Sequence, residues 1–191
     1  MPEQEAAMGS ETKHSEAGIT LIEVMISSLF LTIALLSVAM SMGQGIAATY
    51  TTQEQLIAKQ KAQEALESVM MARNTQEIGF AQIQSVASGG IFVAGFQPIE
   101  NMGNDGIANT ADDAGPVESV TFPGPDGILG NSDDVTVSLT GYKRQITIST
   151  INLPNDTNPD PDIRRIDVDV QYVVRGITKT VRVSSMVSRY S

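Results

Sequence analysis

The longest apolar segment of the chain runs from Ile19 to Met42 and contains one charged residue, Glu23. About 20 apolar residues in a helix cross the hydrocarbon core of a bilayer, so this segment is long enough to span a membrane. A carboxylate at the centre of a membrane costs about 2.5–3.5 kcal/mol, and less near the end of a helix. The presence of Glu23 therefore needs a specific explanation.

A helical pattern continues beyond this segment. Gly43 and Gly45 follow it and are expected to loosen the helix, since each glycine costs about 1 kcal/mol there. Farther on, apolar residues recur with the spacing of one helix face, at Ala62, Ala65, Leu66, Val69 and Met70. No proline occurs between residues 19 and 97. The pattern predicts one helix from residue 19 to about residue 73, with residues 19–42 in the membrane and residues 43–74 packed on a globular head.

The remaining residues, 75–191, are expected to form that head. Residues 75–90 allow a short helix and residues 91–96 a strand, whereas residues 101–134 are an acidic insert rich in Gly, Asn and Asp. Alternating apolar and polar positions predict strands at 135–139, 142–151, 166–172 and 181–187, within a strand region 135–189. A proline-rich loop separates the second and third strands, at 152–162, and the last two form a hairpin. The predicted fold is α+β, with a long helix packed on a small antiparallel sheet.

The start of the apolar segment reads Gly18-Ile19-Thr20-Leu21-Ile22-Glu23-Val24. This stretch resembles the processing site of type IV prepilins and type II secretion pseudopilins, in which a peptidase cuts after the glycine. In that family the new N-terminus is methylated and a glutamate occupies the fifth mature position. Cleavage after Gly18 places Glu23 fifth from Ile19, and removes residues 1–18 as a leader.

The resemblance implies a pilin-like fold and a structural role. The partners would be the prepilin peptidase and methyltransferase, other pilin or pseudopilin subunits and an inner-membrane assembly platform. The chain would first span the bacterial inner membrane once, with its head in the periplasm, and then enter a filament. Glu23 would pair with the N-methylated α-amino group of a neighbouring Ile19 and set the register of assembly.

Three other interpretations of the segment explain less. A secretory signal peptide has a basic start and an apolar run of about 7–15 residues, whereas this run is longer and its flank is acidic. A plain membrane anchor leaves Glu23 unexplained, and a buried core helix is rarely so uniformly apolar. The sequence leaves open whether translation starts at Met1 or Met8.

The charge and composition of the chain argue against several classes of function. The net charge of −10 argues against nucleic-acid binding, which requires clustered basic residues. There is no cysteine, and His14, the only histidine, lies in the predicted leader. The usual zinc sites and histidine-based triads are therefore excluded from the mature chain. A carboxylate-only enzyme, such as a glycosidase, is the remaining enzymatic alternative, but the aspartates occur in turn-like contexts, so we expect no enzyme activity.

The acidic insert contains a repeat of the form D-G-I-x-x-x-x-D-D. Its two copies supply six aspartates: Asp105, Asp112, Asp113, Asp126, Asp133 and Asp134. Ca²⁺ binds 6–8 oxygen ligands from carboxylates and loop carbonyls, and no basic residue lies between Arg73 and Lys143. Calcium is thus one hypothesis, which would make the head a calcium-dependent binding module. A pair of solvated turns is the other.

The late apolar hairpin after a long helix also resembles V-type minor pilins and I-type minor pseudopilins. This similarity concerns architecture only, and the acidic insert interrupts it. The sequence leaves open both pilus versus secretion pseudopilus and major versus minor subunit.

Overall fold

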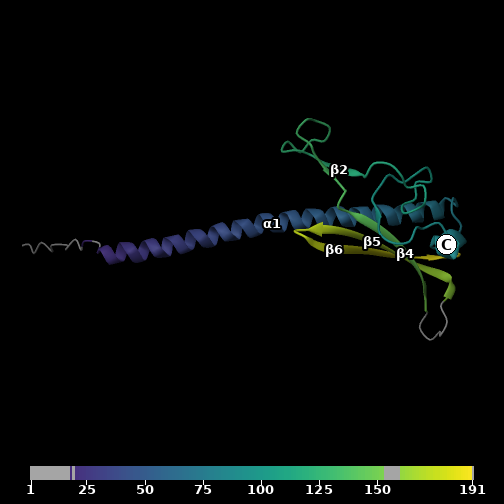
Figure 1. The fold of residues 1–191 in the computed structure, drawn as a ribbon, viewed down its shortest axis with the longest axis horizontal. Helices are drawn as coiled ribbons and strands as arrows, with labels where there is room; N and C mark the ends of the chain where they lie inside the picture. The colour runs from purple at the N-terminus through teal and green to yellow at the C-terminus, as the bar shows by residue number, and fades with distance from the viewer. Residues whose placement is uncertain (1–17, 19, 153–159, 191) are drawn as a thin grey trace, which may run out of the picture. The chain divides into compact units, whose positions relative to one another are not determined.

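The computed structural model describes residues 18, 20–152 and 160–190 of the 191-residue chain. The chain divides into two compact units, Met1–Ala47 and Ala48–Ser191. Helix α1, Leu21–Asn74, contributes to both units, and its hydrogen-bonded structure continues through Gly43 and Gly45 (Figure 1). The predicted long helix is confirmed. Because its sequence contains no proline, each of its residues has the backbone N–H that a continuous helix requires.

Local signals define both ends of α1. At its start, the backbone N–H of Glu23 donates to the backbone oxygen of Thr20 at 3.0 Å and to Thr20 Oγ1 at 3.3 Å. At its end, Gln76 adopts a positive φ of 62°, and Glu77 N–H reaches back to Ala72 O at 2.9 Å. This is a Schellman motif with glutamine in the position where glycine is commonest.

The core of the Ala48–Ser191 unit forms where α1 packs against the sheet. The buried apolar residues of α1 are Ile57, Ala58, Ala62, Ala65, Val69 and Ala72. Four of the six are alanine, so the buried face of α1 consists mainly of small side chains. The predicted face is confirmed at Ala62, Ala65 and Val69, while Leu66 and Met70 lie partly buried at its edge.

The main sheet is antiparallel with the strand order β1-β4-β5-β6. Its strands are β1 (Gln97–Pro98), β4 (Lys143–Ile151), β5 (Asp160–Val174) and β6 (Ile177–Ser188). Alternate residues of β5 enter the core, among them Ile166, Val168 and Val170, each 0% exposed. Arg175 and Gly176 make the two-residue turn between β5 and β6. The three long strands and the hairpin were predicted from alternation and are confirmed.

Two predicted elements are wrong. Residues 75–96 contain two 3₁₀ turns, Phe80–Gln82 and Val86–Ser88, rather than an α-helix and a strand. Their apolar side chains Phe80, Ile83 and Phe92 are nevertheless buried. The backbone of residues 75–96 follows an irregular path along the core, so the positions of its buried side chains fit neither helical nor strand periodicity.

The acidic insert contains a strand that the sequence analysis missed, β2 (Ser119–Phe122). It pairs with β3 (Val135–Ser138) in a separate two-stranded sheet, so the first predicted strand does not join the main sheet. The proline-rich loop is also shorter than expected, because β5 already includes Asp160, Pro161 and Asp162. Residues 153–159 of that loop lie outside the described residues.

Candidate functional site

The apolar part of α1 presents hydrophobic side chains in every direction. Within Met1–Ala47, its large apolar residues range from 48% exposed at Ile26 to 80% at Leu21. This helix is long and apolar enough to cross a membrane, and its most apolar part contains no buried residue. A helix that is hydrophobic all round is stable only inside lipid or among other apolar surfaces.

The predicted processing residues lie at the beginning of this helix. Gly18 is exposed and precedes the helix, whereas Ile19 lies outside the described residues. Glu23 is exposed in the first helical turn, three residues after Thr20. Thr20-Leu21-Ile22-Glu23 has the sequence of a capping box, with threonine at the N-cap and glutamate at the third helical position.

The sequence analysis did not use this T-x-x-E spacing, and the cap that the structure shows is Thr20 Oγ1, which accepts a hydrogen bond from the backbone N–H of Glu23. A carboxylate in the first turn also interacts favourably with the positive end of the helix dipole. The position of Glu23 in the first turn thus favours the start of the helix, independently of the predicted pairing with another subunit. The two roles need different tests, because the pairing requires a second subunit whereas the interaction with the helix dipole does not.

The first aspartate repeat forms a loop held by its own carboxylates. Asp105 Oδ1 accepts a hydrogen bond from Ile107 N at 2.8 Å, and Asp113 Oδ2 accepts one from Asn109 N at 2.7 Å. Asp112 Oδ2 accepts one from Asn104 N at 2.8 Å. Each carboxylate therefore satisfies a backbone donor that the turn leaves without another partner.

The second repeat reproduces the geometry of the first. Asp126 Oδ1 accepts from Ile128 N at 2.8 Å, and Asp134 Oδ2 accepts from Gly130 N at 2.6 Å. Gly106 and Gly127, the glycines of the two D-G-I triplets, both have positive φ, at 64° and 72°. The sequence repeat is thus a structural repeat, in which the first and last aspartates have the same role in both copies.

The structure adds one glycine to each repeat. A Cβ atom on Gly103 would lie 2.2 Å from Asp112 Oδ2, and one on Gly124 would lie 2.3 Å from Asp133 Oδ2. Such distances are too short for any side chain. The full motif is therefore G-x-D-G-I-x-x-x-x-D-D, whose first glycine makes room for the first aspartate of the closing pair.

The six aspartates do not converge on one centre. In the part of the chain that the structure describes, no group of three or more Asp, Glu, His or Cys side chains is arranged to hold a metal ion. Burial raises the pKa of Asp105 above its ordinary value, and the nearby charge of Asp112 adds to this. Calcium binding stays a prediction of the sequence, and the hydrogen bonds account for the loop geometry without it.

A buried charged network connects the insert to the helix and the sheet, and the sequence analysis did not find it. Lys61 of α1 binds Glu64 at 2.8 Å and Glu118 at 2.5 Å. Arg144 of β4 is 0% exposed and lies 3.4 Å from Asp113 Oδ2. Burial lowers the pKa of Arg144. Asp113 of the first repeat therefore anchors the loop to the core.

The outer face of the main sheet also differs from the sequence expectation. Asp167 and Asp169 occupy the polar positions of the alternating pattern in β5 but are only 8% and 6% exposed. Arg182 of β6 donates two hydrogen bonds of 2.7 Å to Asp169, and Arg165 donates one of 2.8 Å to Asp167. The long arginine side chains cover the aspartates, which stabilises the sheet from its outer side.

Comparison of the chain with protein-family models, curated proteins and solved structures finds no match. What the structure itself defines is an α+β protein with one long apolar N-terminal helix and a four-stranded antiparallel sheet. This arrangement is consistent with a pilin-like layout. Any assignment of function therefore depends on the residues described above.

Proposed function

We propose that this chain is the membrane-inserted precursor of a filament subunit of a type IV pilus or a type II secretion pseudopilus. The observation that carries the proposal is the exposed apolar segment of α1, preceded by Gly18 and interrupted only by Glu23. Cleavage after Gly18 would make Glu23 the fifth residue of the mature chain. The combination explains why a carboxylate occurs at one end of an otherwise apolar helix.

The hydrophobic effect supplies the driving force for assembly in this proposal. A subunit that leaves the bilayer must keep residues 21–42 away from water. Stacking such helices in a filament core buries their surface, at roughly 25 cal/mol per Å² of apolar area. Membrane and filament thus offer the same segment two apolar environments, and transfer between them exposes little of it to water.

In this proposal, Glu23 fixes the axial position of each helix relative to its neighbour, which apolar packing alone does not do. Its carboxylate would accept hydrogen bonds from the α-amino group of a neighbouring Ile19, and the two charges would offset each other's desolvation. Removing one partner of a buried ion pair typically costs about 3–5 kcal/mol. A misplaced helix would leave both charges unpaired in the filament core and would be disfavoured by a similar amount.

The head supports the proposal through its position in the sequence and its packing. The second half of α1 buries an alanine-rich face against the sheet, so the helix is part of the head's own core. A head built in this way remains attached to the helix during transfer between membrane and filament. The head would then be displayed outside the helical core.

Intact-mass measurement of the membrane-extracted protein tests the processing step. We expect a chain that begins at Ile19 and carries one N-methyl group. Gly18→Val should block cleavage, whereas Gly9→Val, at the other leader glycine, should leave it unchanged. A mature chain that begins at Met1, Met8 or near Thr49 would refute the proposed function.

A further inference from the structure

The end of the β5–β6 hairpin combines exposed apolar and basic side chains. We define the hairpin tip as Val173, Arg175, Gly176, Ile177 and Lys179. Val173 is 55% exposed and Ile177 is 64% exposed, while Arg175 and Lys179 are also on the surface. Val173 and Ile177 project from opposite faces of the hairpin, because Val174 pairs with Ile177 and Val173 with Thr178. The tip is apolar on both sides.

Contacts along β5 show which end of the head the tip occupies. Near the start of β5, Arg164 Nη1 donates to Ile83 O at 2.9 Å, beyond the C-terminal end of α1. Near its other end, Tyr172 stacks on Tyr142 with ring centroids 5.8 Å apart. The Tyr142 hydroxyl in turn donates to Glu54 of α1. Strand β5 therefore runs antiparallel to the helix, and the tip points towards the beginning of the head.

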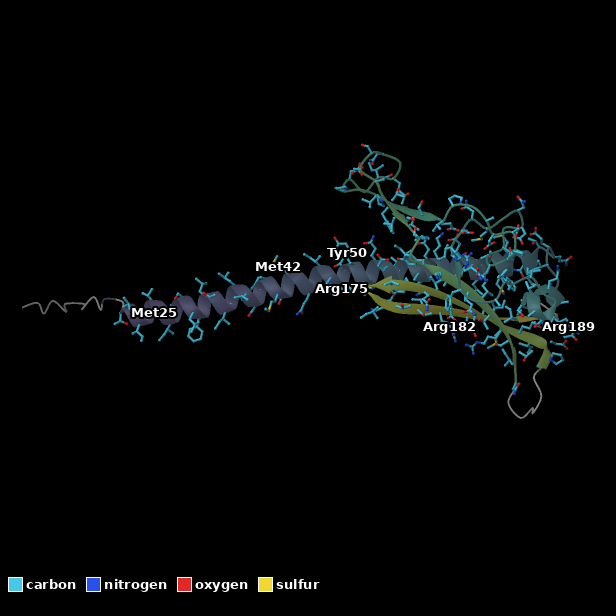
Figure 2. All side chains as sticks on the ribbon, in the orientation of Figure 1. Met25, Met42, Tyr50, Arg175, Arg182 and Arg189 are labelled. Carbon is cyan, nitrogen blue, oxygen red and sulfur yellow. The ribbon has the colours of Figure 1, made fainter. Side chains whose placement is uncertain are left out.

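Simple geometry gives the level that the tip reaches. Three strand residues beyond Tyr172 advance about 10 Å to Arg175. The same distance corresponds to about six or seven residues of helix, counted back from Glu54. The tip is thus level with the first turn of the Ala48–Ser191 unit, where Figure 2 also places Tyr50 and Arg175. Tyr50 is 66% exposed, and tyrosine is enriched at membrane interfaces.

The turn of the hairpin holds a basic residue, Arg175, in a backbone conformation that is unfavourable for its side chain. Arg175 and Gly176 both have positive φ, 52° and 77°, as in a type I′ hairpin turn. Asparagine, aspartate and glycine are preferred at the first position, because other side chains crowd the backbone there. A conformation that favours Asn therefore carries Arg instead, at the point of the hairpin farthest from the core.

The local charge of the tip differs from that of the whole chain. Lys143 lies opposite Gln171 on the neighbouring strand and adds a third cation to Arg175 and Lys179. Two carboxylates near this end are engaged: Glu54 by the Tyr142 hydroxyl, and Asp169 by Arg182. The net charge of the whole chain is −10, whereas this end of the main sheet carries an excess of basic side chains.

We propose that the hairpin tip docks on anionic phospholipid headgroups. Val173 and Ile177 enter the interface between headgroups and acyl chains, and Arg175 and Lys179 contact the phosphates. Basic residues beside apolar ones are the usual composition of surfaces that lie in this interface. The inference rests on the membrane span of the proposed function, because the head begins at Ala48, only a few residues after that span ends in the sequence.

The absence of cysteine allows one label at a chosen site in the full-length protein. The Ile177→Cys variant carries a fluorophore, the protein is reconstituted into vesicles, and a spin label on the lipid headgroups serves as quencher. We expect strong quenching with phosphatidylglycerol present and weak quenching with phosphatidylcholine alone. Arg175→Asn, which suits the turn, should weaken docking about fivefold, since one basic residue near an anionic surface contributes about 1 kcal/mol.

Ile128→Cys is the matched control. Ile128 is 63% exposed, close to the 64% of Ile177, but it lies in the acidic β2–β3 loop, which extends towards the same end of the head in Figure 1. Equal quenching of the labels at positions 128 and 177 would refute the proposal. Disulfide cross-linking of the unlabelled Ile177→Cys variant to a second copy, together with no quenching of the labelled variant, would refute it as well. Resistance to carbonate extraction separately confirms the membrane span, so failure of docking and failure of the proposed function are distinguishable.

Discussion

Lys61 Nζ lies 2.5 Å from Glu118 Oε2, although the two residues are separated by 57 positions in the chain. Their side chains are only 9% and 13% exposed. Burial lowers the pKa of Lys61, but its hydrogen bonds to Glu118 and Glu64 outweigh this and hold the pKa above its ordinary value. The pair attaches the acidic insert to the alanine-rich face of α1.

Removing one partner of this pair should strongly destabilise the head. We expect Lys61→Met to cost about 3–5 kcal/mol, because Glu118 would remain buried without a cation. For a unit of this size the melting temperature should fall by about 10–17 °C. Replacing both residues, by Lys61→Met with Glu118→Leu, should recover most of the loss. Thermal unfolding of a head that begins near Thr49 measures both effects, and equal stability of the single and double variants would contradict this account.

Glu23 should act in assembly through its charge and not only through its position at the start of the helix. Glu23→Gln preserves the capping-box pattern but removes the charge, whereas Glu23→Ala removes both. If the carboxylate pairs with a neighbouring α-amino group, both variants should be cleaved and inserted yet reach sheared filaments in much lower amounts. The ratio of filament to membrane pools measures this. Normal incorporation of Glu23→Gln would show that assembly does not require the charge of Glu23.

Asp105→Asn should stabilise the first repeat at neutral pH. Because the pKa of Asp105 is raised in the folded state, its stabilising contribution is present below the ordinary value of 3.8 and is lost as pH rises through the raised pKa. The amide oxygen of Asn can still accept from Ile107 N. Melting curves should therefore coincide below pH 3.8 and favour the variant at pH 7.

The second repeat supplies the control for this comparison. Asp126 occupies the position of Asp105 but also accepts a hydrogen bond of 2.6 Å from Asn131 Nδ2. Asp126→Asn weakens that charge-assisted bond, so no stabilisation is expected. A similar gain for both variants would show that general charge repulsion in the insert, and not the environment of Asp105, determines the effect.

The calcium hypothesis predicts a higher melting temperature of the head in calcium than in EDTA. A ligand that binds only the folded state at about a hundred times its Kd stabilises that state by about 2.7 kcal/mol. Asp126→Ala combined with Asp133→Ala should abolish the part due to the second loop. Identical curves in calcium and EDTA would exclude the hypothesis and leave both repeats as turns closed by their own hydrogen bonds.

The elements that the sequence predicted share a local cause. The apolar segment, the Ala62–Ala65–Val69 face and the strands around Ile146, Val168 and Val183 are periodic, and periodicity depends only on residues close in the chain. The repeated D-G-I-x-x-x-x-D-D loops belong to the same class. Their hydrogen bonds connect residues only two to eight positions apart, so the repeat in sequence became a repeat in structure.

Only the tertiary structure decided the features that join distant segments. Lys61, Arg144, Asp167 and Asp169 have polar side chains, which sequence patterns assign to the surface, yet each is buried beside a charged partner. The same holds for the irregular segment around Phe80 and Ile83, whose burial follows from where the chain crosses the core. A buried charge is stable only once its partner is in place, and the position of that partner is set by the fold and not by neighbouring residues.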